Sequence, residues 1–462
     1  MRIFPKRSGD PIFTAAQLRG LLIPLIIEQL FVAAVGTADT IMVAQVGEAA
    51  MSGVSLVDSI NMLLHNIFAA LAVGGTIVTS QFLGRKAVDS ACESAKQALV
   101  TVTSLAVIIS VSCFVFRRPI LSFVYGSIDE DVMTNAVSYF AITVLSYPGM
   151  MIFSTSASIF RATGNAKLPM KVSLIMNLIN VSGNAFLIFV MGWGAVGAAV
   201  ATLIARCTGG AIMFIKLRNP RLEVNVSKLF PYKPNIPMIK NILAVGVPTG
   251  IENGIFQIGR VLVQSIMSAF GTTSIAAAAA AHSLISIAIM PGVSVGMALV
   301  TVAGRCVGAG RYDQARRYTV GFIGLAYLSY IVLNTVSLIF QGPILSIFNL
   351  SPETVVLAKQ LVMINIVGLV TLWPPAFTTP NALRAANDAK FTMIVSISSM
   401  WMFRVGLGYL LSGPLGVVGI WYGMMADWLF RAIVYMFRFY SDRWTKHTIL
   451  AASVEEKSEI EE

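Results

Sequence analysis

Long apolar segments, separated by short polar or turn-forming stretches, recur along the whole chain. Twelve of them are long enough to cross the hydrocarbon core of a bilayer as a helix. They lie at residues 17–45, 53–80, 96–116, 132–160, 171–191, 194–216, 238–269, 277–304, 318–341, 355–382, 391–412 and 416–438. The pattern predicts an all-α polytopic membrane protein with twelve transmembrane helices.

The composition agrees with this pattern. Of the 462 residues, 56% are apolar and only 12% are charged, about half the charged fraction of a soluble domain, which excludes an ordinary soluble enzyme. The formal charge of +11 does not indicate nucleic-acid binding, because the basic residues are scattered between apolar segments instead of lying on one face. The four cysteines form no CxxC pair, so we expect free thiols and neither a zinc site nor disulfides.

The distribution of Lys and Arg predicts the orientation in the membrane. Of the 33 basic residues, 26 lie in the N-terminal stretch, the even-numbered loops and the C-terminal stretch, and three lie on the opposite side. Cytoplasmic loops are enriched in Lys and Arg, so both termini are predicted to be cytoplasmic. This requires an even number of crossings, in agreement with twelve.

A proline-rich polar stretch divides the chain into two halves. It predicts an N-terminal lobe at 1–216, a cytoplasmic linker at 217–237, a C-terminal lobe at 238–440 and a cytoplasmic acidic tail at 441–462.

The two halves resemble each other at a nearly constant offset. Pro24 and Glu28 recur as Pro248 and Glu252, 224 residues later, and the segment 161–167 recurs near 384–390 at an offset of 223. Six crossings return the chain to its starting side, so the halves have the same orientation. We therefore predict two pseudo-symmetric six-helix bundles around a central cleft.

Ionisable residues occur inside the apolar segments, whereas the motifs of ATP-binding proteins and zinc proteases do not occur in the sequence. The chain contains no GxxxxGK[ST] or HExxH motif, and we expect neither an enzyme nor a cofactor. Asp39, deep in the first helix, is the first candidate for a coupling site that binds H⁺ or Na⁺, because a carboxylate can change its charge as its access to water changes. The alternative is that Asp39 only links helices through hydrogen bonds.

Two further pairs of titratable residues occupy repeat-matched positions. Glu28 and Glu252 each lie four residues after a proline, and either face the cavity or satisfy backbone groups freed by the proline, with Arg260 as an alternative partner of Glu252. Asp58 and His282 also align at 224, and His282 either relays protons or is an ordinary packing residue.

Other polar and aromatic residues add candidates for the cavity. Asn177, Asn180 and Asn184 share one helix face, which we expect to meet Asp39, although amides also join helices without any further role. Trp373 precedes two prolines and is the best aromatic candidate for the cavity. Arg206, Asp427 and Arg431 are expected to form a structural ion-pair group.

At several places the sequence resembles the multidrug and toxic compound extrusion (MATE) transporters. The matching stretches are spread over nearly the whole chain and lie at 24–47, 81–84, 161–167, 194–199 and 383–390. The resemblance implies two six-helix lobes around a cleft that opens alternately to either side, with organic-cation export driven by H⁺ or Na⁺. It also implies an N-lobe cation site at Asp39, Tyr139, Asn180 and Asn184.

The chain departs from the family pattern at three positions. Some members have an aspartate at the position of Asn184, and members with a C-lobe cation site have acidic residues where this chain has Phe256 and Trp373. Coupling is therefore expected to centre on Asp39. With one carboxylate and two amides, the site offers little charge to hold Na⁺, so we favour H⁺.

The sequence thus predicts a secondary antiporter, acting as a monomer in the bacterial inner membrane, that exports small amphipathic and cationic organic compounds. One alternative is a flippase for lipid-linked precursors, which shares the broader fold but needs a strongly basic cavity. A channel or receptor, and an intramembrane enzyme, are the other classes considered.

Overall fold

The computed structural model describes residues 10–446 except 127, 230 and 347–349. These residues form helices, turns and loops, with no strand among them. Contacts between Cα atoms divide the described chain into two compact units. One is Ala15–Gly250, here the N-terminal unit; the other, the C-terminal unit, comprises the described residues before Ala15 and from Ile251 onward. The boundary falls inside one long helix, α9.

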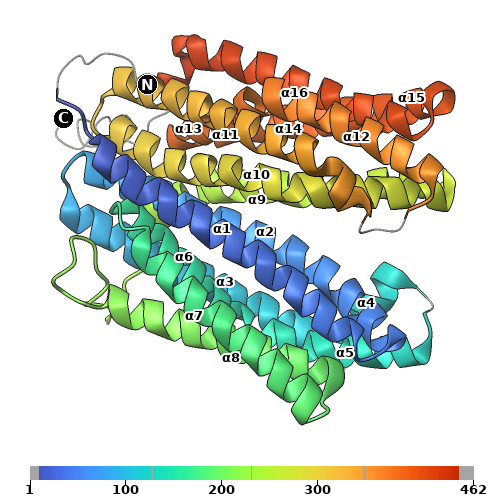
Figure 1. Ribbon diagram of the computed structural model, residues 1–462. Coiled ribbons are helices and arrows are strands. Elements are labelled where there is room, and N and C mark those ends of the chain that lie inside the picture. The colour runs from blue at the N-terminus through green and yellow to red at the C-terminus, as the bar shows by residue number, and fades with distance from the viewer. Residues whose placement is uncertain (1–9, 127, 230, 347–349, 447–462) are drawn as a thin grey trace. The chain divides into compact units, whose positions relative to one another are not determined.

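The N-terminal unit contains eight α-helices, one π-helical segment and the first part of α9 (Figure 1). They are α1 (Ala15–Ala44), α2 (Glu48–Gly84), α3 (Val88–Val115), α4 (Arg117–Tyr125), α5 (Glu130–Leu145), α6 (Tyr147–Ala162), α7 (Lys167–Asn184), η1 (Ala185–Val190), α8 (Gly194–Leu217) and α9 (Ile236–Ser268).

The C-terminal unit contains the rest of α9 and the helices that follow it. They are α10 (Gly271–Gly308), α11 (Tyr312–Ser346), α12 (Pro352–Thr371), η2 (Pro374–Thr378), α13 (Thr379–Ala385), α14 (Ala389–Ser399), η3 (Met400–Leu407), α15 (Gly408–Leu415), α16 (Val417–Tyr440) and the short 3₁₀ helix η4 (Asp442–Lys446).

Each predicted apolar segment coincides with a helix or with a helix interrupted once or twice. Ten described helices are long and apolar enough to span a bilayer, and α5 with α6, bent by 44°, makes an eleventh span. The twelfth predicted span is α9, which is helical at the predicted place but carries Glu252 and Arg260 along its length. The all-α polytopic membrane fold is confirmed.

Three helices contain π-helical turns. The segments η1, η2 and η3 interrupt the predicted spans at 171–191, 355–382 and 391–412, the first and last of which correspond in the two repeats. A π turn leaves the regular hydrogen-bond pattern and often lies at a functional site. These interruptions draw attention to Asn184, Trp373 and Arg404, which lie beside or within them.

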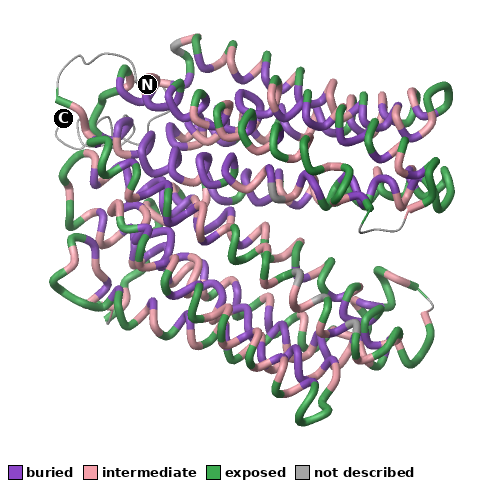
Figure 2. Tube along the Cα trace, in the orientation of Figure 1, coloured by how far each residue is buried: buried purple, intermediate pink, exposed green. Residues whose placement is uncertain are grey.

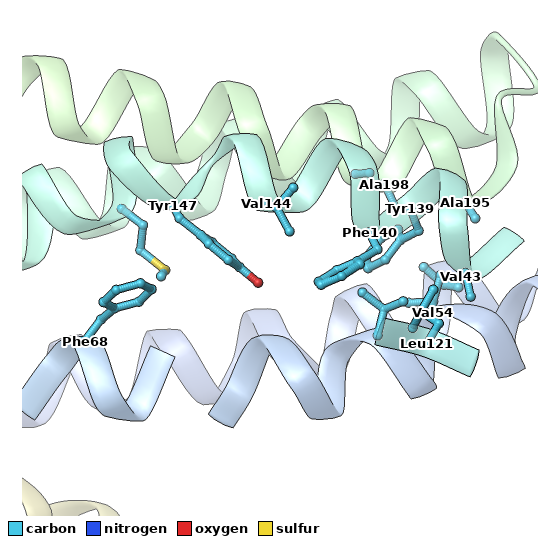
Figure 3. Packing of buried hydrophobic residues seen from close by; sticks show 14 of the residues in the cluster. Val43, Val54, Phe68, Leu121, Tyr139, Phe140, Val144, Tyr147, Ala195 and Ala198 are labelled. Atoms are coloured by element: carbon cyan, nitrogen blue, oxygen red, sulfur yellow. The ribbon is translucent and has the colours of Figure 1, made fainter. Parts of the chain in front are cut away.

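Apolar side chains are divided between the interior of each unit and its outer surface. Buried and exposed residues alternate along the helices of each unit (Figure 2), and large apolar side chains such as those of Leu178 and Val190 are exposed. In the N-terminal unit, Phe68, Phe140 and Tyr147 belong to one buried cluster, and the rings of Phe68 and Tyr147 meet edge to face at 5.9 Å (Figure 3). Exposed apolar faces of this kind suit contact with lipid.

The stretch predicted as a linker packs onto α3. The Tyr232 hydroxyl donates to Gln97 Oε1 at 2.6 Å, and Gln97 in turn donates to the carbonyl of Lys233 at 2.7 Å. Partial burial raises the pKa of Tyr232, so its hydroxyl stays protonated and remains a donor at neutral pH. Val224 and Val226 are buried in a second apolar cluster with Leu83 and other residues.

Close packing of α2 against α5 gives a first prediction about stability. A Cβ atom on Gly53 would lie 2.9 Å from both the nitrogen of Ala136 and the carbonyl oxygen of Val132, which are backbone atoms that cannot rotate away. Gly53→Ala should therefore destabilise the protein by about 1–3 kcal/mol, the usual cost of overpacking, measured by thermal unfolding in detergent.

The matched control for this prediction is Gly20→Ala in α1. No described atom lies within 4 Å of a Cβ at Gly20, so this substitution should be neutral or slightly stabilising. Equal melting temperatures for the two variants would contradict the packing described here.

Candidate functional site

The carboxylate of Asp39 lies against two amides from another helix. Asn184 Nδ2 donates to Asp39 Oδ1 at 2.7 Å. When the Asn180 amide is oriented with its nitrogen toward Asp39, it lies 2.9 Å from both carboxylate oxygens, and its oxygen accepts from the Thr202 hydroxyl at 3.1 Å. Three of the four residues predicted for the N-lobe cation site thus meet in the structure.

The end of α7 explains how this group is positioned. Asn180 and Asn184 are four residues apart and buried, so their amides share one face of α7 next to α1. A Cβ on Gly183 would lie 3.0 Å from the Cβ of Ala201, so α7 and α8 approach closely and bring Thr202 to Asn180. No pattern in the sequence pointed to Thr202. Asn177, expected on the same face, has a buried Nδ2 with no hydrogen-bond partner among the described residues.

A second carboxylate, Asp58 on α2, has its own set of donors. The Tyr139 hydroxyl donates to Asp58 Oδ1 at 3.2 Å, and Asn61 Nδ2 donates to the same oxygen at 3.3 Å. Asn61 also accepts a 2.6 Å hydrogen bond from Tyr147, whose hydroxyl is visible in Figure 3. Tyr139, the fourth residue of the predicted cation site, therefore binds Asp58 and not Asp39.

One guanidinium lies in the same region of the N-terminal unit. Arg206 on α8 donates to the Ser146 hydroxyl at 2.9 Å and acts electrostatically on both Asp39 and Asp58. No guanidinium in the described part of the chain is within ion-pair distance of Asp39. The direct contacts of Asp39 are with neutral amides.

The repeat-matched glutamates form matching ion pairs. Glu28 on α1 lies 3.6 Å from Arg161 on α6, and Glu252 on α9 lies 2.7 Å from Arg384 on α13. Both glutamates are 6% exposed. The arginines are themselves repeat-related, at the offset of 223 noted in the sequence, so each unit contains one copy of the same buried Glu–Arg pair.

Glu252 has partners different from those expected. The spacing along α9 allowed Arg260 as its partner, but this prediction is wrong: Glu252 Oε1 accepts from Arg384 at 2.7 Å and from the Ser396 hydroxyl at 2.6 Å. The Ser396 hydroxyl also lies 2.7 Å from that of Tyr435. Spacing along one helix identified a possible face, but the two partners come from two other helices, α13 and α14.

A second group of charges in the C-terminal unit surrounds Asp427. Arg431 Nε donates to one Asp427 oxygen at 2.6 Å, and Arg404 lies 3.0 Å from the other. The guanidinium carbons of Arg404 and Arg431 lie 5.0 and 5.2 Å from the centre of the Phe256 ring. The expected ion pair of Asp427 with Arg431 is present, but its third member is Arg404, since Arg206 belongs to the other unit.

The two remaining candidates have mainly aromatic or basic neighbours. Trp373 is 7% exposed, stacks on Phe377 with ring centres 4.8 Å apart, and meets Tyr330 edge to face at 5.1 Å. His282 is exposed, and its Nε2 lies 3.5 Å from Arg260. Its predicted relationship to Asp58 spans the two units and stays a prediction.

The fold and these buried charges define a polytopic helical membrane transporter built from two repeats. The MatE family model matches the chain twice, at residues 24–186 and 248–410, and the two matches begin 224 residues apart. The chain therefore belongs to the MatE family, the family of multidrug efflux transporters that its motifs indicated, and is a transporter and not an enzyme. The internal repeat is confirmed.

Similar proteins extend over nearly the whole chain. A probable multidrug resistance protein NorM from Thermotoga maritima is 26% identical over 94% of each chain, and an uncharacterized transporter, YisQ, from Bacillus subtilis is 26% identical over 95% of this chain and 96% of its own.

Solved structures show the same fold. A multidrug resistance MATE family transporter in an outward-facing conformation has a TM-score of 0.84 at 20% identity, covering 93% of this chain and 99% of its own. A MATE structure in the bent conformation also has a TM-score of 0.84, at 21% identity, covering 92% and 94%.

The buried Glu252–Arg384 pair gives a second prediction. Arg384→Gln leaves the Glu252 charge buried without its cation, so it should destabilise the protein by about 3–5 kcal/mol, measured by thermal unfolding in detergent. The double variant Glu252→Gln with Arg384→Gln removes both charges and should recover much of this loss.

The surface pair Arg118–Glu130 is the control, since its 2.8 Å contact is similar but its side chains are 61% and 71% exposed. Arg118→Gln should change the melting temperature little. If it were as harmful as Arg384→Gln, burial would not be the cause.

Proposed function

We propose that this transporter exports small amphipathic, cationic organic compounds in exchange for H⁺ by alternating access, with Asp39 as the residue that carries the proton. The observation that supports this role most directly is the environment of Asp39. Its carboxylate lies in a membrane helix and is bound by two neutral amides. It can gain or lose a proton without breaking an ion pair.

Protonation changes what these amides can do. The ionised carboxylate accepts from Asn180 and Asn184, whereas the protonated acid offers one donor of its own. Asn184 Oδ1 is buried and has no hydrogen-bond partner among the described residues, so a rotated amide supplies an acceptor for that proton. The two protonation states thus favour different arrangements of α1 against α7, and the neutral state has lost the charge that attracts a cationic substrate.

The donor set fits H⁺ better than Na⁺. Sodium binds oxygen atoms, but Asn184 presents its amide nitrogen to the carboxylate, and Asn180 does the same when its amide is oriented to donate to Asp39 and to accept from Thr202. A Na⁺ ion at Asp39 would require both amides to turn and would be balanced by a single carboxylate. We therefore assign H⁺ as the coupling ion.

The energy available is sufficient for export. Each net positive charge that the exchange moves inward across 100 mV supplies about 2.3 kcal/mol, which sustains a substrate gradient of roughly 45-fold. The exchange of one H⁺ for one monovalent cation moves no net charge and is driven by the pH difference.

Localisation and assembly complete the proposal. The bacterial relatives and the distribution of basic residues support a multi-pass protein of the inner membrane with both termini in the cytoplasm. Residues 1–216 and 238–440 act as the two lobes, 217–237 as the cytoplasmic linker and 441–462 as a cytoplasmic tail. The transporter is proposed to act as a monomer.

The third prediction concerns Asp39. In proteoliposomes with an acidic lumen, the wild-type protein should accumulate the cationic dye rhodamine 123, and Asp39→Asn should reduce this to the rate of protein-free liposomes because the residue can no longer carry a proton. An imposed Na⁺ gradient should drive no uptake in either protein.

Asp131→Asn is the control, since it removes an exposed carboxylate outside the site and should transport normally. Wild-type rates in Asp39→Asn under a pH gradient would remove Asp39 from the mechanism, and uptake driven by Na⁺ alone would contradict the assignment of H⁺.

A further inference from the structure

The C-terminal unit contains more buried positive than negative charge around Asp427. Arg404 and Arg431 are 7% and 3% exposed and share the single carboxylate of Asp427, which is fully buried. Glu252, the nearest other buried carboxylate, is already paired with Arg384. A buried charge without a counter-charge is costly, so this group is suited to receive an anion.

Arg404 has donor capacity to spare. Its Nε is buried and has no hydrogen-bond partner among the described residues. Arg431, in contrast, uses all three nitrogens, on Asp427 and on the hydroxyl and carbonyl of Ser396. Of the two, Arg404 is therefore the guanidinium with a free N–H group.

A third arginine, Arg260, adds positive charge near Arg404 and is exposed. Arg260 lies one helical turn after Phe256, the ring over which Arg404 is placed, and interacts electrostatically with Arg404. Arg260 is exposed and lies 3.5 Å from His282 on α10. The exposed Arg260 thus adds a positive charge that acts on the buried Arg404.

Acidic residues of the N-terminal unit contrast with basic residues on the repeat-related helices of the C-terminal unit. There α1 and α2 carry Asp39 and Asp58, whereas their counterparts α9 and α10 carry Arg260 and His282. His282 stands at the repeat-matched position of Asp58. The two halves therefore share the same helices and the same Glu–Arg pair. They differ in the charged and titratable residues just named, which are acidic in the N-terminal unit and basic in the C-terminal unit.

We propose that Arg260 and Arg404 bind an oxyanion, a carboxylate or a phosphate, so that exported compounds that carry such a group beside their cationic one bind more tightly than compounds with the cationic group alone. Guanidinium groups bind both oxyanions through charge-assisted hydrogen bonds. This inference rests on the export function proposed above and adds a preference for zwitterionic amphiphiles among its substrates.

Rhodamine 110, which has a free carboxylate, and its methyl ester, rhodamine 123, form a matched pair of probes. Binding is measured by fluorescence polarisation with the purified protein, and export in proteoliposomes with an acidic lumen. Arg260→Gln should weaken binding of rhodamine 110 about tenfold, the worth of one charged hydrogen bond, and leave rhodamine 123 unchanged. Arg404→Lys, which keeps the charge that Asp427 requires, should act in the same direction.

Lys359→Gln serves as the control, because it removes an exposed charge of the same unit and should alter neither dye. Equal effects of Arg260→Gln on the two dyes would overturn the proposal. So would export of rhodamine 123 by the wild type without binding of rhodamine 110, a result that leaves the export function intact. If neither gradient drives either dye, the export function itself fails.

A lipid phosphate is the other source of the same oxyanion. Nanodiscs of phosphatidylcholine alone are therefore compared with nanodiscs that also contain phosphatidylglycerol. Equal binding of rhodamine 110 in both supports the substrate as the source. If rhodamine 110 binds the wild type more weakly in nanodiscs with phosphatidylglycerol than in those without it, and Arg260→Gln shows no such difference, the site binds the lipid. That result would overturn the role of the site in substrate recognition.

Discussion

The structure depends on one constraint above all: a carboxylate placed within a membrane helix must be stabilised without being fixed in one charge state. An ionised side chain at such depth costs roughly 2.5–3.5 kcal/mol even on the mildest scales. In this protein the hydrogen bonds from Asn180 and Asn184 offset part of that cost for Asp39. Amides stabilise the charge without neutralising it, which suits the reversible proton binding that we propose for Asp39.

The other buried carboxylates are arranged differently. Glu28, Glu252 and Asp427 each meet at least one guanidinium, and these ion pairs tie together helices of one unit. The matched Glu–Arg pairs give both units the same internal contact. The positions that differ between the units, Asp39 in one and Arg260 with Arg404 in the other, are those to which we assign proton exchange and oxyanion binding in our proposals.

Much of this arrangement could be predicted from the sequence, for a physical reason. Crossing a bilayer demands about 20 apolar residues per helix, and that signal is strong in a single sequence. The face shared by Asn180 and Asn184 also follows from helix periodicity. Partners on other helices do not: Thr202 gave no signal, Tyr139 turned out to bind Asp58, and Glu252 found Arg384 instead of Arg260. Periodicity fixes which side a residue faces, and only tertiary packing fixes what it meets.

The central claim, that Asp39 alternates between its charged and neutral forms, is tested most directly by infrared difference spectroscopy of the purified protein as rhodamine 123 binds. The account predicts loss of a protonated carboxyl band in the wild type, because Asp39 releases its proton to water when the cationic ligand binds, and absence of that band change in Asp39→Asn. A binding spectrum without any carboxyl change, or the same change in Asp39→Asn, would contradict it.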